Sequence, residues 1–346
     1  MQNVHEIDIK NDNSLSQNAS ANLKIKQKKK YRDYDSGILK QEGYNTRIQY
    51  KEWIEDKDAK LKKLDKLILQ DYKIPVISHV IYFSNEDSPI PIKEYHQVMM
   101  INSASILSKE NGNFKHYFWT TNINLLPENV QKIPGLEIHM VSELSEHMLY
   151  PVLLNILDRA NKERGYFAQA SDIVRILALQ KYGGIYHDND YEILSSKIVG
   201  YFRAFNFFGT KEFLKKDSFI ANCVMAGTAN HPIFNSAVHL IARNLKLLKD
   251  CPPPDYVLNP ATFGAKVIFE TSPKMFEIAY YKGKNLEGNV DMIFPANILS
   301  DAEYVRSKYS QSRYYKAMSL EVSLAHEAVA VGGDLFSGDW QDNGTL

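Results

Sequence analysis

Residues 169–190 combine three signals that few architectures accommodate together. A helical pattern covers residues 169–182, and Gly183 and Gly184 follow it, where a helix end favours a left-handed residue. A short apolar strand begins directly after the glycines and ends at Asp188. A helix that connects to a strand through so short a turn is typical of an α/β unit, in which helices pack on the faces of a sheet.

The rest of the chain after Pro75 shows the same alternation. Apolar runs rich in β-branched and aromatic residues predict strands at residues 76–83, 116–120 and 136–140. Helical patterns cover residues 93–108 and 143–162. Strands that alternate with helices predict a parallel or mixed sheet between helical layers, so the fold class is α/β. We assign residues 74–346 to a single domain of this class.

The first 73 residues have a different composition. Residues 1–44 are rich in Asn, Ser, Gln and Lys and poor in large apolar residues, which predicts a disordered polar tail. A basic run from Lys24 to Arg32 is either solvated or makes electrostatic contact with an anionic membrane or partner. Residues 45–73 carry an apolar stripe at helical spacing. We predict an N-terminal helical segment there that packs on the domain, with a helix lying on a membrane as the alternative.

The composition argues against several classes of protein. The chain has 346 residues with 41 basic and 41 acidic side chains, so its formal net charge is zero, which argues against a dedicated nucleic-acid binder. No apolar run approaches the roughly 18 residues of a membrane-spanning helix, and the start lacks the pattern of a signal peptide. Two cysteines are too few for a disulfide scaffold or a zinc framework. We therefore expect a soluble protein made in a reducing cytosol, and export without an N-terminal signal stays open.

Two carboxylates lie where the strand after Gly184 gives way to a loop. Asp188 and Asp190 are two residues apart, and on an extended chain such side chains point the same way. Two anions that face one spot need a cation between them or a proton on one of them, and their oxygens suit Mg²⁺ or Mn²⁺. A polar turn is the alternative. A calcium loop is excluded, since Ile193 and Val199 occupy the places of its Gly and Glu.

Asp172 and Arg175 lie one helical turn apart in the preceding helix, so they share a face. They form either a surface ion pair, worth about a few tenths of a kcal/mol, or a substrate contact. In the second case Asp172 accepts hydrogen bonds from sugar hydroxyls and Arg175 contacts sugar or phosphate. Arginine suits anionic oxygens because its guanidinium is planar and always charged.

Together these residues resemble a known family. The segment ASDIVRILALQKYGGIYHDND is similar to the motif region of the DXD-containing sugar-transferase family. That family includes fungal initiating mannosyltransferases, bacterial capsule glycosyltransferases and the glucosylating domains of large clostridial toxins. The matching positions are Ser171, Asp172, Arg175, Gly183, Gly184, Tyr186, Asp188 and Asp190. The resemblance is specific because separate positions agree in their spacing.

Further landmarks resemble the same family. The first strand is similar to the family's first strand, with Tyr82 where the family has a base-stacking tryptophan. The segments around Trp119 and Asn222 are also similar to family segments. Near the end, Ser337 and Trp340 resemble the family's closing Ser-x-Trp, with one extra residue between them.

Two histidines receive mainly structural interpretations. His79 lies on an apolar strand, and we predict a core histidine whose hydrogen bonds are satisfied. His187 stands where the family has an apolar residue. We predict a surface histidine there, and a pH-sensitive neighbour of a metal is the alternative.

The resemblance implies a fold, a donor and a set of roles. The fold would be a single Rossmann-like GT-A type glycosyltransferase domain with helical additions. Mn²⁺ or Mg²⁺ would stabilise the leaving diphosphate of a UDP-sugar, with retention at the anomeric carbon, and the metal ligands would be Asp188, Asp190 and Asp339. The catalytic residues would be Asp172, Arg175, Asp188 and Asp190. The nucleotide sugar would be bound by Tyr82, which stacks on the base, and by Asp172, Arg175, Tyr186, Asp188, Ser337 and Trp340.

The remaining hypotheses about function differ mainly in the molecule that would receive the sugar. The basic tail, the helical segment and the lack of an N-terminal anchor favour a toxin- or effector-like enzyme that glycosylates a host protein. Such an enzyme would be made in the bacterial cytoplasm and secreted into a host cell. A bacterial cytoplasmic transferase of capsule or surface polysaccharide is the alternative enzyme. A catalytically dead module that binds a nucleotide sugar is the alternative from a different class.

Overall fold

The computed structural model of the protein describes residues 71–163, 165–214, 217–260, 262–294, 299 and 332–334. The predicted tail at residues 1–44 lies outside the described residues. The predicted helical segment at residues 45–73 does so too, apart from its last three residues, which are not helical.

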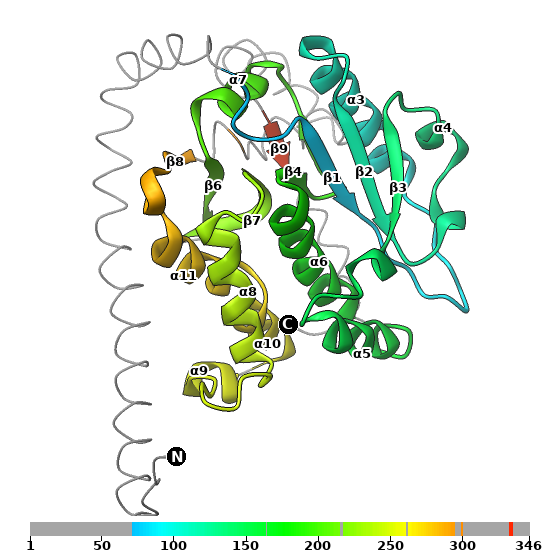
Figure 1. The fold of residues 1–346 in the computed structure, drawn as a ribbon. Coiled ribbons are helices and arrows are strands. Elements are labelled where there is room, and N and C mark those ends of the chain that lie inside the picture. Colours follow the sequence, from blue (N-terminus) through cyan, green and yellow to red (C-terminus); the bar gives the residue numbers. More distant parts are fainter. Residues whose placement is uncertain are drawn as a thin grey trace, which may run out of the picture.

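The described part of the chain is built around a mixed seven-stranded sheet (Figure 1), with the strand order β3-β2-β1-β4-β7-β6-β8. Its strands are β1 Ile77–Ile81, β2 Lys115–Thr120, β3 Leu136–Met140, β4 Gly184–His187, β6 Phe207–Leu214, β7 Asp217–Gly227 and β8 Asp291–Phe294. A separate two-stranded sheet pairs β5 Tyr191–Ile193 with β9 Gly332–Asp334. The predicted strands near the start of the domain correspond to β1, β2 and β3, and the predicted α/β class is confirmed.

β4 joins the two halves of the large sheet. On one side β1 pairs in parallel with both β4 and β2, and β2 pairs in parallel with β3. On the other side β7 is antiparallel to β4, β6 is antiparallel to β7, and β8 is parallel to β6. The parallel half has the predicted Rossmann-like arrangement. Its strands end at a common edge, which is where open α/β sheets bind ligands.

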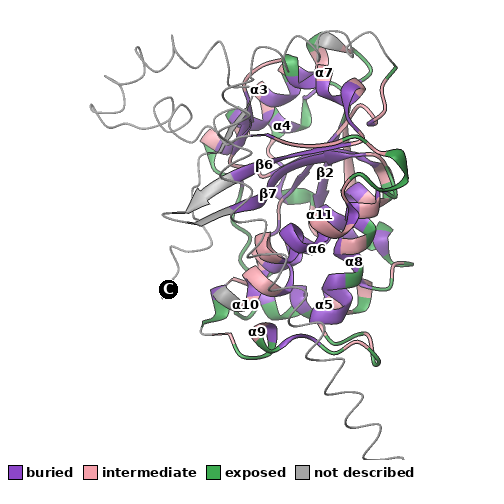
Figure 2. Ribbon diagram, turned by 90° about the vertical axis from the view of Figure 1, so that its left-hand side faces the viewer, coloured by how far each residue is buried: buried purple, intermediate pink, exposed green. Residues whose placement is uncertain are grey.

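Helices cover both faces of the sheet (Figure 2). One layer holds α3, α4 and α7, and the other holds α5, α6, α8, α10 and α11. The helices are α3 Glu94–Glu110, α4 Glu128–Gln131, α5 Tyr150–Ala160, α6 Tyr166–Tyr182, α7 Lys197–Ala204, α8 Pro232–Asn244, α9 Asp255–Leu258, α10 Phe263–Glu270 and α11 Pro273–Gly283. Short 3₁₀ turns occupy Ile123–Leu125, Val141–Leu144 and Leu286–Gly288. None of the described helices is long and apolar enough to cross a membrane.

The helix predicted at residues 143–162 is shorter in the structure. The chain first forms the 3₁₀ turn Val141–Leu144, and α5 begins only at Tyr150. Pro151 lies in the first turn of α5. Proline favours a helix start because its missing N–H has no partner there in any case, so the sequence marks this later beginning.

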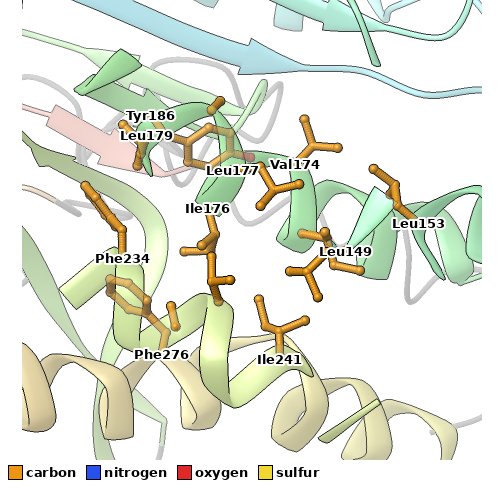
Figure 3. Close-up of a cluster of buried hydrophobic side chains, with 14 of the residues drawn as sticks. Leu149, Leu153, Val174, Ile176, Leu177, Leu179, Tyr186, Phe234, Ile241 and Phe276 are labelled. Carbon is orange, nitrogen blue, oxygen red and sulfur yellow. The ribbon is translucent and has the colours of Figure 1, made fainter. Parts of the chain in front are cut away.

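The larger hydrophobic cluster packs α6 against its neighbours (Figure 3). α6 is buried along most of its length. Its contacts come from the sheet and from α5, α8 and α11, and the cluster includes Leu149, Leu153, Val174, Ile176, Leu177, Tyr186, Phe234, Ile241 and Phe276. Close-packed interiors deform little. The polar residues Asp172 and Arg175 on α6 are therefore held on a rigid element.

The two glycines make the direct connection from α6 to β4 possible. Gly183 has a φ of +65° and Gly184 a φ of +98°, the left-handed region that the sequence predicts. A Cβ on Gly184 would lie 2.4 Å from the carbonyl oxygen of Ile77, and one on Gly183 would lie 2.7 Å from the backbone nitrogen of Ala229. The backbones approach too closely for any side chain at either position.

Candidate active site

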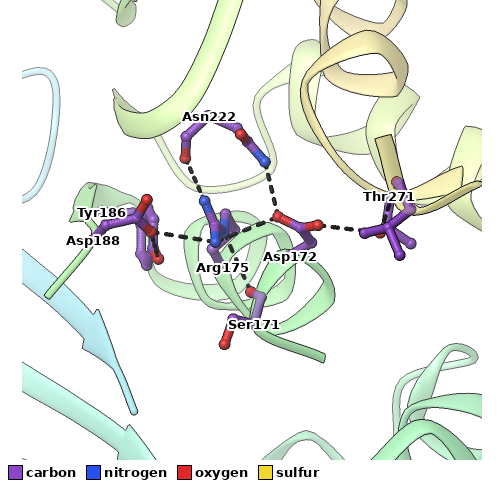
Figure 4. Close-up of polar contacts among 8 residues, drawn as sticks. Ser171, Asp172, Arg175, Tyr186, Asp188, Asn222 and Thr271 are labelled. Carbon is purple, nitrogen blue, oxygen red and sulfur yellow. Dashed lines mark hydrogen bonds and ion pairs between the residues drawn. The ribbon is translucent and has the colours of Figure 1, made fainter. Parts of the chain in front are cut away.

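Four of the predicted site residues, Asp172, Arg175, Tyr186 and Asp188, lie together around the end of β4 (Figure 4). Asp188 directly follows β4, and its backbone N–H donates to the carbonyl oxygen of Cys223 in β7 at 2.9 Å. α6 leads into β4 through the glycine turn and runs back along it. The middle of α6, which carries Asp172 and Arg175, therefore lies beside the end of β4.

Arg175 links the two parts of the predicted motif. Its Nη2 lies 3.3 Å from Asp172 Oδ1 and 3.2 Å from Asp188 Oδ1. Its Nη1 donates to the carbonyl oxygen of Asn222 at 2.7 Å, and its Cζ lies 4.5 Å from the ring centre of Tyr186. Burial alone would lower the pKa of Arg175. The electrostatic influence of Asp188, Tyr186 and Asp172 is larger and raises this pKa, so Arg175 stays a cation. The side chains of Arg175 and Asp172 are only 8% and 4% exposed, so this is no surface ion pair.

The Asp172 carboxylate is held from three directions. Asn222 Nδ2 donates to Oδ1 at 2.9 Å, Arg175 contacts the same oxygen, and the Thr271 hydroxyl donates to Oδ2 at 3.2 Å. Burial raises the pKa of Asp172, and Arg175 and the hydrogen bonds oppose this shift. A carboxylate has about four acceptor sites. Together with a further hydrogen bond from the Ser272 side chain, these contacts fix its orientation.

Asp188 shares its environment with an aromatic hydroxyl and a cation. The Tyr186 hydroxyl donates to its Oδ1, the oxygen that also faces Arg175. Burial raises the pKa of Asp188 to about 7, with Arg175 opposing the shift and the charge of Asp190 adding to it. The Asp188 side chain is 28% exposed, so a ligand can reach it. A nearby cation would relieve the cost of keeping this carboxylate charged.

The extended chain predicted between Asp188 and Asp190 is wrong. These residues form a turn, in which the Tyr191 N–H donates to the Asp188 carbonyl oxygen at 3.1 Å. The two carboxylates are still coupled, because the charge of Asp190 acts on Asp188. No group of three or more acidic, His or Cys side chains that could hold a metal occurs within the described ranges. Two coupled carboxylates nevertheless fit Mg²⁺ or Mn²⁺, which keep waters and share phosphate ligands.

Tyr82 directly follows β1 and so lies at the same edge of the sheet. Its hydroxyl donates to the carbonyl oxygen of Ile90 at 2.8 Å, and its backbone N–H donates to that of Trp119 at 3.0 Å. The ring is half-buried and packs on the cluster beneath α3 and α4. Base stacking by Tyr82 stays a prediction.

The predicted closing segment, with Ser337, Asp339 and Trp340, lies outside the described residues. Two residues that hold the site were not predicted as site residues: Asn222 in β7 and Thr271, which follows α10. Both contact Asp172 across a long stretch of sequence, so no local spacing could indicate them. The family resemblance around Asn222 was the one available signal.

The prediction of a surface histidine at position 187 is wrong. His187 is 2% exposed, because β4 is an inner strand of the sheet, and burial lowers its pKa to about 4. The core histidine predicted at position 79 is confirmed. His79 Nε2 donates to the Gly183 carbonyl oxygen at 2.7 Å, and its Nδ1 accepts from Trp119 Nε1 at 3.1 Å.

Comparisons with known proteins agree with this site. Residues 92–211 match the family model described as glycosyltransferase sugar-binding region containing DXD motif. No curated protein matches the sequence. Among solved structures, the chain is similar to PaToxG glycosyltransferase, with 18% identity and a TM-score of 0.46 over 69% of this chain and 82% of that one.

Two further solved structures are also similar to the chain. For the UDP-bound glycosyltransferase domain of the YGT toxin, the identity is 12% and the TM-score 0.42, over 74% of this chain and 90% of that one. For the catalytic domain of alpha-toxin from Clostridium novyi, the identity is 10% and the TM-score 0.34, over 62% of this chain and 68% of that one.

The matched family region contains both halves of the site. It includes Asp172 and Arg175 in α6 and the turn from Asp188 to Asp190. The carboxylates of Asp172 and Asp188 both contact the guanidinium of Arg175. The resemblance inferred from the sequence is therefore confirmed. Residues 92–211, about a third of the chain, thus match the family of glycosyltransferases with a DXD-containing sugar-binding region.

Proposed function

We propose that the protein is a metal-dependent, retaining glycosyltransferase that moves a sugar from a UDP-sugar to a protein. The observation that supports this most directly is the buried Arg175 between the carboxylates of Asp172 and Asp188. Arg175 fixes the position of Asp172, which we assign to the sugar, relative to Asp188, which we assign to the diphosphate. Groups that are oriented before substrate arrives stabilise a transition state without having to reorganise.

Asp172 orients the donor sugar. Asn222, Thr271 and Arg175 hold its carboxylate in one orientation. Precise orientation of reacting groups lowers the barrier because the entropy of alignment is lost on binding rather than in the reaction step.

Asp188 and Asp190 are the residues that would hold Mn²⁺ or Mg²⁺. When bound, the ion acts as a Lewis acid that stabilises the negative charge developing on the leaving diphosphate. Tyr186 and Arg175 both contact Asp188 Oδ1, which leaves its other oxygen for the ion. Asp339 is proposed as a further ligand.

The nucleotide is bound at the ends of β1 and β4. Tyr82 stacks on the uracil from the end of β1, since an aromatic ring there offers a face to the base. Ser337 and Trp340 close over the donor and exclude water, which would otherwise compete with the acceptor. Retention at the anomeric carbon follows from the family resemblance.

The acceptor is a host protein, and the enzyme acts as a toxin or effector. The basic run from Lys24 to Arg32 supports this assignment, because clustered positive charge is attracted to anionic membrane surfaces by about 1 kcal/mol per residue. Such attraction would bring the enzyme to membrane-associated acceptors after secretion from the bacterial cytoplasm.

The test is UDP release from a panel of UDP-sugars with Mn²⁺, Mg²⁺ or Ca²⁺, before and after treatment with a chelator. We expect release with one donor, loss of release on chelation and better restoration by Mn²⁺ than by Ca²⁺. Binding of a UDP-sugar without UDP release would instead indicate a binding module. Full release in excess chelator would contradict the role of the metal.

A further inference from the structure

A second pocket lies beside the first turns of α6. It has a volume of about 510 Å³ and is bounded by α5, α6, the end of α8 and the segment from α9 to α10. Its wall is aliphatic and includes Ile156 and Val257, whereas Gln169, Asn244 and Glu270 form a buried polar floor. Glu270 and Gln169 are hydrogen-bonded to each other at 2.9 Å. None of the residues placed in the site above lines this pocket.

Three cations surround the one acid of this pocket. Arg159, Lys246 and Lys266 line it together with Glu270, so the charges of its lining are three positive and one negative, a net charge of +2. Burial raises the pKa of Glu270, and the charges of all three cations oppose this shift. Each cation therefore lies within electrostatic range of the Glu270 carboxyl group. Glu270 is buried, whereas Arg159 and Lys246 are exposed and Lys266 is half-exposed. The positive charge is therefore presented toward solvent.

The same two segments build the pocket and the active site. Gln169 and Asp172 lie one turn apart on α6, and their partners Glu270 and Thr271 are consecutive residues at the end of α10. The pocket floor is thus one helical turn from the carboxylate assigned to the donor sugar.

We propose that this pocket binds an acidic side chain of the protein acceptor, close to the residue that receives the sugar. The proposal rests on the proposed function and names the class of its acceptor. The cations at the mouth complement a carboxylate, and the aliphatic wall provides apolar contact for the neighbouring part of a peptide.

A polysaccharide acceptor fits the pocket less well. The described residues that line it include no aromatic ring on which a sugar could stack. Its apolar contacts come from branched aliphatic side chains and from Pro260. We therefore assign the pocket to a peptide with an acidic side chain, and an acidic oligosaccharide serves as the competing probe in the test.

The first experiment measures direct binding by fluorescence anisotropy on the full chain. The probes are a labelled glutamate-rich peptide that contains Ser, Thr and Tyr, its glutamine counterpart and a labelled oligogalacturonate. The variant is Lys246→Glu with Lys266→Glu. The matched control is Lys132→Glu with Lys197→Glu, because these exposed lysines lie directly after α4 and at the start of α7, on the opposite helical layer.

We expect the glutamate peptide to bind better than its glutamine counterpart and better than the oligogalacturonate. Its affinity should fall about tenfold or more in the pocket variant, since two partly exposed charge contacts become repulsive. It should not change in the control variant. Equal binding by pocket and control variants, or no preference for glutamate over glutamine, would overturn the proposal. Preferred binding of the oligogalacturonate would overturn the assignment to a peptide.

A second experiment separates failure of this inference from failure of the proposed function. UDP release without acceptor tests the glycosyltransferase reaction alone, and transfer to acidic or basic peptides tests the pocket. We expect the pocket variant to lose its preference for acidic over basic peptides, whereas the control variant keeps it. A protein that releases no UDP would contradict the proposed function, while the anisotropy experiment would still decide whether the pocket selects acidic peptides.

Discussion

Arg175 makes it possible to place the buried acid Asp172 beside the half-buried acid Asp188. Buried carboxylates are costly unless they are paired and hydrogen-bonded, and removal of one partner leaves an uncompensated charge. Here one guanidinium contacts both Asp172 and Asp188, while Asn222 supports the arginine and Asp172 together. The site is therefore a connected network, in which each residue also fixes the orientation of its neighbours.

The acidic turn provides the first prediction at this scale. Asp188→Ala and Asp190→Ala should each lower sugar transfer by about 10² or more, because electrostatic stabilisation of the leaving group is lost. The control is Asp158→Ala, whose carboxylate is exposed and paired with Lys162 on α5. The measurement is UDP release at limiting Mn²⁺ together with circular dichroism. Turnover near that of the wild type in either site variant would contradict the assignment.

Thr271 provides a second prediction. Thr271→Val removes the hydrogen bond to Asp172 Oδ2 and should lower the free energy of unfolding by about 1–3 kcal/mol, since a buried acceptor loses its donor. The matched control is Thr210→Val. Thr210 is buried in β6, and its hydroxyl has no hydrogen-bond partner among the described residues, so this variant should be neutral or stabilising. Urea unfolding distinguishes the two, and equal effects would argue against a role of Thr271 at Asp172.

Sequence could indicate the local part of this network but not its distant part. Asp172, Arg175 and Asp188 were predicted because helix periodicity and the glycine turn place them close together in the chain. Thr271 carried no such signal, since it reaches Asp172 from a segment 99 residues away. His187 was predicted to be a surface histidine. It is buried because β4 is covered on both edges, by β1 and by β7, and that pairing is not visible in the local sequence.

Among the structural elements, the connection from α6 to β4 determines where the site lies. It brings a buried helix and an inner strand together without a loop, so Arg175 and Asp188 have little freedom relative to each other. The strands of the parallel half were predicted because each is a compact apolar run. The pairing of β5 with β9 could not be predicted, because its strands are three residues long and far apart in the sequence.

The glycine turn is the element most sensitive to substitution. Gly184→Ala should lower the free energy of unfolding by at least about 2 kcal/mol, because a side chain at positive φ is strained and would also meet the Ile77 carbonyl oxygen. Gly112→Ala is the control. A Cβ there has no atom within 4 Å, and the expected change stays within about 0.5 kcal/mol. Thermal unfolding provides the measurement, and equal stability of the two variants would contradict the close approach.

For the whole molecule, buried histidines make stability depend on pH. Burial lowers the pKa of His79 to about 3 and that of His116 to about 4. Both groups are neutral in the folded and unfolded states well above pH 6.5, so they impose no cost there. As the pH falls below about 6.5, the unfolded chain binds protons that the folded chain does not, so stability decreases until the folded pKa values are reached.

His116→Gln isolates one of these contributions. Between about pH 7.5 and pH 5.5 the wild type should lose about 1 kcal/mol more of its unfolding free energy than the variant does. The comparison of two proteins is needed because the raised pKa of Asp188 acts in the opposite direction over part of this range. Urea unfolding at both pH values gives the difference, and parallel losses in the two proteins would contradict the assigned protonation state of His116.

The position of β4 in the sheet also has a kinetic consequence. Its backbone is bonded to a parallel neighbour on one edge and an antiparallel neighbour on the other. Each of its bonded amide protons can exchange with solvent deuterium only after the neighbouring inner strand that accepts its hydrogen bond has separated from it. We expect Ile185 and Tyr186 to be among the last amides to exchange, at rates governed by global unfolding, whereas edge strand β3 exchanges earlier through local opening. The acid that follows β4 would then be attached to the slowest-opening strand of the molecule, so its position would persist through the fluctuations that loosen the rest of the sheet.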